Sequence, residues 1–518
     1  MKAWMAFFFV AVLAALALRL PELERRPMHN DEGVNAVKFG QLWDHGEYRY
    51  DPNEHHGPTL HYLTAAFCKL TGAPDYKNLT ESRLRLVTAL VGLALLLPLL
   101  WLRNQLGRGA LVAAAFFTAL SPALVFYGRY WIHEELLVLF TFALLVAGWR
   151  FVKGPSWQWA ILAGASLGLI QATKETFVFV IAAAIGALVL DVLFTAWLRR
   201  LSGENGLAVF AAPERRSALL KHLGLAVIAW FVVWAALFSS FGSNWPGLLD
   251  SFRTFATWSD NAGHHSPHAQ AWDFYLERLF WFKSFRGIHS TEVLVLVLAI
   301  FAIQESFRRK PRMAADPALV RFIAFYTVLL TGIYAAIPYK TPWCALGFLH
   351  GFILLAGVGA TVLWRLWNQP VLRYGSVALV VLAAAQLGWQ AWRLSFPLGN
   401  DRGNPWVYAH TSDDLVNLVE KVNELGVAAQ GNATMIQVVT TCGDCWPLPW
   451  YLRKFERTGW WSQPPEDLSA PIVIASADLK LPLDERGTHF MAGYFELRPK
   501  VFLQLFVERG LWEKSLKR

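Results

Sequence analysis

The chain has 518 residues, of which 55% are hydrophobic and only 16% are charged, against about 25% charged residues in a typical soluble protein. Lys and Arg number 47 and Asp and Glu 38, so the formal net charge is +9, and the mean hydropathy is +0.34. This composition excludes a disordered or collagen-like chain and a nucleic-acid-binding protein that depends on dense charge. Four cysteines in a chain of this length exclude a disulfide scaffold. The composition therefore indicates a polytopic membrane protein.

Apolar runs long enough to cross a bilayer recur along the chain. The first, Trp4 to Leu20, is followed by charged residues instead of a small-residue cleavage site, so we expect a retained span and not a signal peptide. Further spans are predicted at 84–102, 109–127, 132–150, 157–173, 176–197, 222–241, 291–306, 318–337, 343–366 and 374–393. The sequence thus predicts about eleven transmembrane helices.

The distribution of Lys and Arg predicts the orientation of these spans. Alternate loops carry basic residues at Arg103 and Arg108, at Arg150 and Lys153, between Arg199 and Lys221, between Arg308 and Arg312, and at Arg365 and Arg373. Short cytoplasmic loops are enriched in such residues, so these loops and the N-terminus are predicted to be cytoplasmic and the C-terminus extracytoplasmic. We expect a multi-pass protein of the cytoplasmic (inner) membrane that contacts anionic lipids.

Three extracytoplasmic segments are predicted. The loops 21–83 and 242–290 belong to a membrane domain over 1–393, and the segment 394–518 has the composition of a soluble α/β domain. In this tail, Ser412 precedes a helical pattern that ends at Gly426, and β-type runs follow at Met435–Thr440 and Pro471–Ala475. The fold class is therefore a polytopic α-helical membrane protein with a small C-terminal extracytoplasmic α/β domain.

An adjacent acidic pair, Asp31 and Glu32, closely follows the first span and lies near the outer membrane surface. One interpretation is a helix N-terminus near Gly33, where acidic residues are favoured. The other is a catalytic pair, and the two interpretations are compatible. An Asp-Glu pair by itself does not decide between them.

Several cations lie at the outer ends of predicted spans, where the positive-inside rule would not place them. Arg129 and His133 precede the fourth span at a spacing of four, which would put them on one helix face, and Glu134 follows. Lys174 and Lys340 follow the fifth and ninth spans. Charge at the membrane is costly, so its retention without a partner suggests a function.

Structural interpretations of these cations remain open. Lys174 could pair with its neighbour Glu175 or extend to lipid headgroups, and Arg129 could pair with Glu134. The functional interpretation is an outward-facing cavity in which cations neutralise a lipid-linked phosphate. A carboxylate in this cavity would accept the proton of an incoming hydroxyl or amine. That chemistry is glycosyl transfer with inversion in a single displacement.

At these residues the chain resembles the GT-C superfamily of polyprenyl-phosphate-dependent glycosyltransferases. It is most similar to the dolichyl-phosphate-mannose protein mannosyltransferases, to the lipid A aminoarabinose transferases, and to a branch named for an archaeal flippase-activity-associated protein. The resemblance covers residues 1–393 and implies a GT-C type fold. It also implies that Asp31 is the catalytic base and that Glu32 belongs to the same acidic motif.

The resemblance further implies a donor-phosphate site. Relatives carry His-Pro-Pro-Leu or Lys-Pro-Pro-Leu at the phosphate, and this chain departs from that pattern with His56-Gly57-Pro58-Thr59-Leu60. The residues matched to the phosphate site are His56, Arg129, Lys174 and Lys340, and the supporting residues are His55, His133 and Glu134.

A metal site and a disulfide are two further candidates. Some relatives use a divalent metal ion, and the candidate ligands here are Glu54, His55, His264 and His265, whose spacing fits no fixed metal motif. No other cofactor is indicated. Cys442 and Cys445 form a C-x-x-C pair outside the cytoplasm, which favours a small structural disulfide over a redox or zinc site.

The sequence thus predicts a glycosyltransferase whose partners are a polyprenyl-phosphate-linked sugar, membrane lipids and an acceptor that is a protein, lipid or glycan. No nucleic acid is expected. The alternatives are a flippase or carrier for a lipid-linked glycan, or a non-catalytic component of an envelope glycan pathway. A carrier should show paired halves with broken helices, which are not evident in this sequence.

Overall fold

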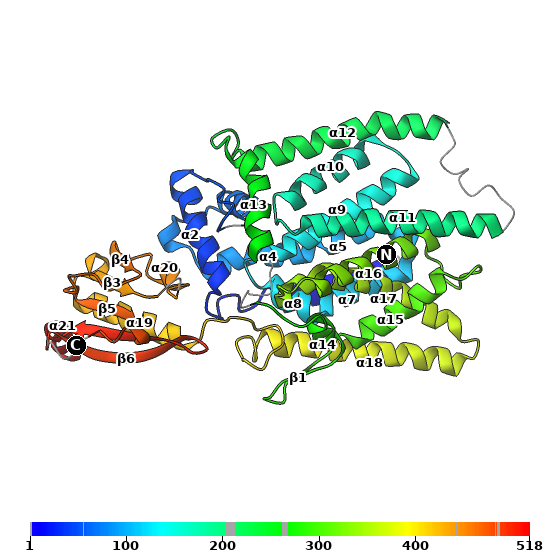
Figure 1. Ribbon diagram of the computed structural model, residues 1–518. Coiled ribbons are helices and arrows are strands. Elements are labelled where there is room, and N and C mark those ends of the chain that lie inside the picture. The colour runs from blue at the N-terminus through cyan, green and yellow to red at the C-terminus, as the bar shows by residue number, and fades with distance from the viewer. Residues whose placement is uncertain are drawn as a thin grey trace.

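The computed structural model describes residues 3–54, 56–201, 213–261, 268–441, 444–481, 483 and 487–517. Long apolar helices lie side by side in one region, and a small sheet lies at one end of the molecule (Figure 1). Among the described residues, seven helices are long and apolar enough to cross a membrane, or eight when a bent pair is taken as one span. The polytopic helical fold predicted from the sequence is therefore confirmed.

Helices overlap each of the eleven predicted spans, but α1, α10 and α15, with 17, 15 and 14 residues, are not among the helices long enough to count as candidate spans. The overlapping helices are α1 (Ala3–Arg19), α4 (Glu81–Ala94) with α5 (Leu96–Trp101), α7 (Arg108–Leu120) with α8 (Pro122–Gly128), α9 (Glu134–Lys153), α10 (Trp157–Gln171), α11 (Phe177–Leu201), α12 (Pro213–Phe238), α15 (Val293–Ser306), α16 (Pro317–Ala336), α17 (Leu346–Leu366) and α18 (Pro370–Ser395). A short helix, α6 (Arg103–Leu106), links α5 to α7.

The bend between α7 and α8 shapes the outer side of the membrane region. The two helices meet at 57°. Ser121 interrupts the helix, and Pro122 begins the next one, because proline has no N–H to continue the helical hydrogen bonds but suits a first helical position. The bend directs the end of α8 toward the outer loops, and residues 129–133 form the turn before α9.

The two long outer loops contain short elements of their own. The first has α2 (Asn30–His45), α3 (Thr59–Leu70) and the 3-10 helix η1 (Tyr76–Asn78). The second has α13 (Gly247–Asn261), α14 (Phe274–Phe280) and a hairpin of β1 (Phe282–Lys283) and β2 (His289–Ser290). A further 3-10 helix, η3 (Pro342–Ala345), leads into α17. Figure 1 shows α2 and α13 at the same end of the helices.

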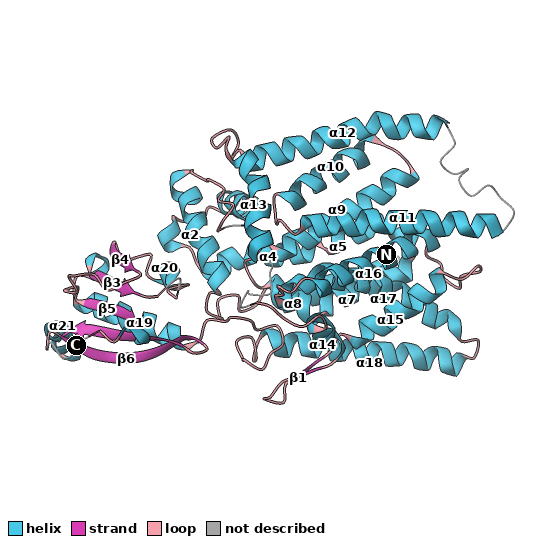
Figure 2. Ribbon diagram, viewed as in Figure 1, coloured by secondary structure: helices cyan, strands magenta, loops and turns pink. Residues whose placement is uncertain are grey.

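The tail forms a mixed five-stranded sheet with the order β4-β3-β5-β7-β6, shown with its helices in Figure 2. The strands are β3 (Met435–Val439), β4 (Arg457–Trp461), β5 (Ile472–Ser476), β6 (His489–Arg498) and β7 (Val501–Glu508), and the helices are α19 (Asp414–Ala428), α20 (Leu448–Tyr451) and α21 (Arg509–Leu516), with 3-10 turns η4 (Gly431–Ala433) and η5 (Ala477–Leu479). β3 pairs in parallel with β4 and β5, whereas β7 is antiparallel to β5 and β6. The helix and the two strands predicted in the tail are present.

The tail contacts the first outer loop close to the start of α2. Trp450 Nε1 donates to Glu81 Oε1 at 2.7 Å, and Tyr451 Oη accepts from the Met28 N–H at 2.8 Å. A Cβ atom added to Gly33 would lie 2.6 Å from the Pro447 Cβ, so only glycine permits this approach. The contact holds the tail beside the acidic pair.

Candidate active site

The acidic pair forms the first turn of α2. His29 caps this helix, because its Nδ1 accepts from the Asp31 N–H at 3.1 Å while Glu32 Oε2 accepts from the His29 N–H at 2.8 Å. Asp31 keeps 43% of its side chain exposed, and the basic side-chain atom within 4.0 Å of its carboxylate among the described residues is His29 Nδ1, at 3.9 Å. The helix N-terminus interpretation is therefore confirmed, and Asp31 remains free to contact a substrate.

Glu32 is fully buried and faces the protein interior. Its oxygens bind Arg85 of α4 at 2.7 and 2.6 Å, and Oε1 also accepts from the Trp131 N–H at 2.9 Å. Burial alone would raise the pKa of Glu32, but the Arg85 guanidinium lowers it to about 2. Through these bonds Glu32 fixes the start of α2 to α4 and to the turn at Trp131. Because both oxygens of Glu32 are buried and already paired, the geometry favours Asp31 over Glu32 as the base.

Lys174 and Glu134 form a buried ion pair at the outer end of the membrane helices. Their side chains are 7% and 6% exposed. Burial opposes a charged amine, but Glu134 outweighs this effect and holds the pKa of Lys174 well above its usual value. The structural interpretations that paired Lys174 with Glu175, and Arg129 with Glu134, are therefore wrong.

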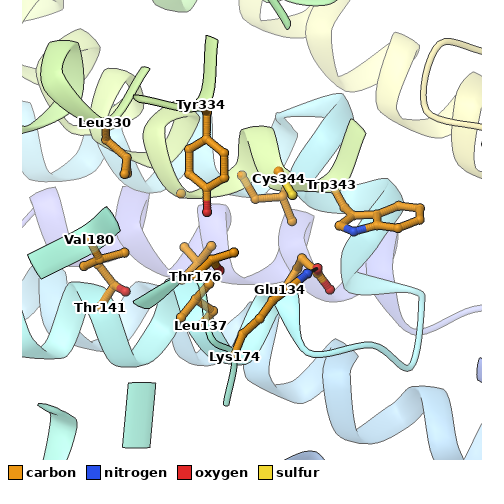
Figure 3. A pocket seen from close by; sticks show the side chains of 13 residues that line it. Glu134, Leu137, Thr141, Lys174, Thr176, Val180, Leu330, Tyr334, Trp343 and Cys344 are labelled. Atoms are coloured by element: carbon orange, nitrogen blue, oxygen red, sulfur yellow. Dashed lines mark hydrogen bonds and ion pairs between the residues drawn. The ribbon is translucent and has the colours of Figure 1, made fainter. Parts of the chain in front are cut away.

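This ion pair lies at one end of a narrow pocket between α9, α11, α16 and α17, whose volume of about 20 Å³ is close to that of one water molecule. Figure 3 shows Lys174 and Glu134 pointing toward each other near Trp343, whereas Val180, Leu330 and other apolar side chains line the opposite end. The pocket thus combines a polar end with an apolar end. An amphiphile with a charged head group has this distribution of polarity.

The predicted phosphate residue His56 lies beside this pair of charges. Its Nδ1 is 2.9 Å from Glu175 Oε2, and its ring stacks on Trp258 at a centroid distance of 5.0 Å. The ring centroid of His133 lies 5.3 Å from that of His56, and His133 Nε2 donates to the Gly57 carbonyl at 3.0 Å. Burial and the charge of His56 keep the pKa of His133 well below its usual value, so His133 supports the loop as a neutral ring.

Tyr339 lies within electrostatic range of both Lys174 and Asp31. Burial raises the pKa of Tyr339, and the charges of both Lys174 and Asp31 act on it, with opposite signs. The loop of Tyr339 pairs with the second outer loop through the bridge between Ala269 and Tyr339 and through the Lys340 N–H, which donates to the His268 carbonyl at 3.0 Å. A geometric link joins the acidic pair to the pocket: the ring centroid of His29, two residues before Asp31, lies 5.7 Å from that of Trp343, which lines the Lys174 pocket.

The side chain of Arg129 lies away from the Lys174 pocket. Its guanidinium donates to carbonyls at the end of α1, including Pro21 O at 2.7 Å and Glu22 O at 3.1 Å, and stacks on Phe396 at 4.2 Å. It does not line the pocket of Lys174. The predicted helical face shared with His133 is wrong, because the residues between them form the turn from α8 to α9.

The remaining candidates are placed as follows. The Lys340 amine donates to the backbone carbonyl of Ile337, three residues earlier, and burial lowers the pKa of Lys340. Glu54 lies in the first outer loop, whereas His55, His264 and His265 lie outside the described residues. Within the described residues, no group of three or more His, Cys, Asp or Glu side chains is arranged to hold a metal ion. Cys442 also lies outside the described residues, so the pairing of Cys445 with it is not tested and the disulfide stays a prediction.

Comparisons with known proteins agree with this architecture. The model of the dolichyl-phosphate-mannose-protein mannosyltransferase family matches residues 55–213. ArnT from Cupriavidus metallidurans, solved bound to undecaprenyl phosphate, is 14% identical with a TM-score of 0.60, and the match covers 99% of each chain. The archaeal oligosaccharyltransferase AglB from Archaeoglobus fulgidus, solved with an inhibitory peptide and a dolichol-phosphate, is 13% identical with a TM-score of 0.53, covering 100% of this chain and 77% of AglB.

This chain has the GT-C fold. The resemblance to polyprenyl-phosphate-dependent glycosyltransferases that the sequence predicted is confirmed. Together with its apolar helices, the fold makes the chain an integral membrane protein. No curated protein matches the sequence closely enough to count as a relative.

Three residues of the site were not predicted from the sequence. Arg85 binds Glu32, Glu175 binds His56, and Tyr339 lies between the charges of Lys174 and Asp31. An arginine inside an apolar run was a usable signal for Arg85, because an intramembrane charge needs a partner. Nothing in the sequence around Glu175 or Tyr339 identified their long-range contacts.

Proposed function

We propose that the protein is an inverting glycosyltransferase that moves a sugar from a polyprenyl-phosphate donor to an acceptor at the outer face of the membrane. The observation that carries this proposal is the buried Lys174–Glu134 pair at the polar end of an otherwise apolar pocket, in the neighbourhood of Asp31. The likeness to ArnT, whose structure holds undecaprenyl phosphate, supports this class of donor.

The donor would bind with its phosphate at Lys174 and the first part of its lipid along the apolar side chains of the pocket. In the free protein Glu134 balances the Lys174 charge, so a phosphate would compete with Glu134 for the amine. His56 is also within this region and stacks on Trp258. These groups would stabilise the negative charge that grows on the phosphate as it leaves.

Asp31 would act as general base for the acceptor. Its carboxylate is partly exposed and sits in the first turn of α2, where an acceptor can reach it. The acceptor oxygen or nitrogen attacks the anomeric carbon and gives its proton to Asp31. The bond from that carbon to the phosphate oxygen breaks, the polyprenyl phosphate leaves, and the anomeric configuration inverts.

The proposed arrangement in the membrane follows from the positions of the site and of the basic loops. Residues 1–393 would form the catalytic membrane domain with a cytoplasmic N-terminus, and residues 394–518 would form an extracytoplasmic domain next to the acceptor. The tail contact at Gly33 is close to Asp31, which supports a role in acceptor binding. A divalent metal at Glu54, His55, His264 and His265 stays a prediction.

The test is transfer by the purified full-length protein incubated with a panel of polyprenyl-phosphate sugars. We expect donor-dependent release of polyprenyl phosphate with at least one sugar, and its loss in Asp31→Asn. Protein in liposomes that moves the intact donor across the bilayer without releasing phosphate would instead favour the carrier. Full release by Asp31→Asn would show that another group is the base.

A further inference from the structure

A second polar pocket lies where the outer ends of α1 and α18 meet. It has a volume of about 130 Å³ and shares no lining residue with the Lys174 pocket. Arg25, Arg26, Arg85 and Arg129 line it, together with Phe396 and Asp413. Four guanidinium groups around one pocket are unusual at the outer boundary of a membrane protein, where cations are disfavoured.

Two of these four arginines have carboxylate partners. Arg85 binds Glu32 at 2.6 Å, and Arg25 binds Glu22 at 2.7 Å. Within the part of the chain that the structure describes, no carboxylate lies within 4.0 Å of Arg26 or Arg129. The pocket therefore holds two guanidinium groups without a direct carboxylate partner, although the charges of Glu22, which lines the pocket, and of Glu32 act on them at longer range.

The hydrogen bonds of Arg129 explain its position, but because they go to uncharged backbone carbonyls they do not balance its positive charge. Its guanidinium holds the end of α1 through backbone carbonyls, as a structural residue would. Arg26 differs, because its Nη2 donates to the Arg129 carbonyl at 3.1 Å while its buried Nε has no hydrogen-bond partner. Arg26 also covers the face of Tyr130 at 3.3 Å, which orients its guanidinium without balancing its charge.

The two charges also act on each other. Burial lowers the pKa of Arg129 to about 9, and the neighbouring Arg26 contributes to this shift. Burial likewise lowers the pKa of Arg26 to about 10. A bound anion would relieve both effects, because an opposite charge favours the protonated guanidinium.

We propose that this arginine pocket binds a phosphate group, carried by a lipid headgroup or free in solution, at a site separate from the proposed donor pocket. Guanidinium groups match phosphate oxygens in pairs of parallel hydrogen bonds. The pocket adjoins the ends of α1 and α18, two helices of the membrane region, and Phe396 gives it an apolar wall. This inference does not depend on the transfer reaction.

The test uses the full-length protein purified in a neutral detergent and its thermal unfolding followed by tryptophan fluorescence. One arm adds inorganic phosphate, and the other compares nanodiscs of phosphatidylcholine with nanodiscs that also contain phosphatidylglycerol. Arg26→Gln removes the guanidinium that has no carboxylate partner. Arg26→Lys keeps the positive charge but removes the planar group that can donate two parallel hydrogen bonds to a phosphate. Arg253→Gln is the matched control, because Arg253 is exposed on α13 in a pair with Asp250.

We expect a saturable rise in Tm in at least one arm for the wild type and for Arg253→Gln. The apparent affinity should fall at least about tenfold in Arg26→Gln, and by less in Arg26→Lys. A response to phosphatidylglycerol but not to inorganic phosphate would identify a lipid headgroup as the ligand. The proposal is overturned if neither arm gives a saturable shift, or if both Arg26 variants respond as the wild type does.

Discussion

Replacing Lys174 by Met should separate the structural role of the Lys174–Glu134 pair from its proposed role in binding donor. Removal of one partner from a buried ion pair leaves the other charge buried and costs about 3–5 kcal/mol. Both side chains are almost fully buried, at 7% and 6% exposed, so the full effect applies in principle. Glu134 can take up a proton when Lys174 is absent, so we expect a cost near the lower limit, about 3 kcal/mol.

The double variant Lys174→Met with Glu134→Leu removes both charges together. Replacing a buried pair by apolar side chains is often neutral for stability, so unfolding free energy should recover to within about 1 kcal/mol of the wild type. Donor-dependent release of polyprenyl phosphate should not recover, because no amine remains for the phosphate. The matched control is Lys153→Met, which breaks the half-exposed pair with Asp316 and should cost less than about 1 kcal/mol without affecting release.

The assays are chemical unfolding of the purified variants in detergent and release of the lipid phosphate from a donor sugar. Wild-type turnover by the stable double variant would refute the placement of the donor phosphate at Lys174. Wild-type stability of the single variant Lys174→Met would refute the reasoning that the pair is charged and buried.

Three further predictions concern the acidic pair and the tail. Asp31→Asn should lower turnover about 100-fold or more with Tm unchanged, and a stable variant with full turnover would contradict this. The pKa of Glu32 is lowered from 4.5 to about 2, so its stabilisation is present above pH 4.5 and lost as the pH falls toward 2; Glu32→Gln should lack this component in an acid unfolding series. Mass spectrometry of the alkylated protein should show Cys442 joined to Cys445, and two free thiols would exclude the disulfide.

The membrane fold was predictable because each span is specified locally. A run of about 20 apolar residues satisfies its own backbone hydrogen bonds in a helix whatever its neighbours are, so the pattern predicts the span without knowledge of its packing. The same holds in the tail, where the apolar face of α19 and the β-type runs of β3 and β5 are local patterns. The end of α19 at Ala428, two residues beyond the predicted stop at Gly426, shows the limit of such signals.

The partners of the charged residues were not predictable in this way. Local spacing suggested Glu175 for Lys174, whereas helix packing brings Lys174 to Glu134, 40 positions earlier, and gives Glu175 to His56, 119 positions away. The family resemblance implied that Arg129 binds the donor phosphate, and that role stays a prediction. Its spacing to His133 predicted a shared helix face, but α8 ends at Gly128 and the guanidinium contacts carbonyls that follow α1.

The different orientations of Asp31, which is partly exposed, and Glu32, which is buried, follow from helix geometry. Successive residues of a helix point about 100° apart, so two adjacent carboxylates at a helix N-terminus cannot both face one site. Glu32 is the third residue of α2, and from this position its side chain accepts a hydrogen bond from the backbone N–H of the N-cap residue His29. Because its charge is buried, Glu32 also requires a cationic partner, which is Arg85. Asp31 is consequently turned outward and stays partly exposed. The capping interpretation and the proposed catalytic interpretation are thus compatible with one arrangement, in which Glu32 fixes the helix and Asp31, the proposed base, stays partly exposed.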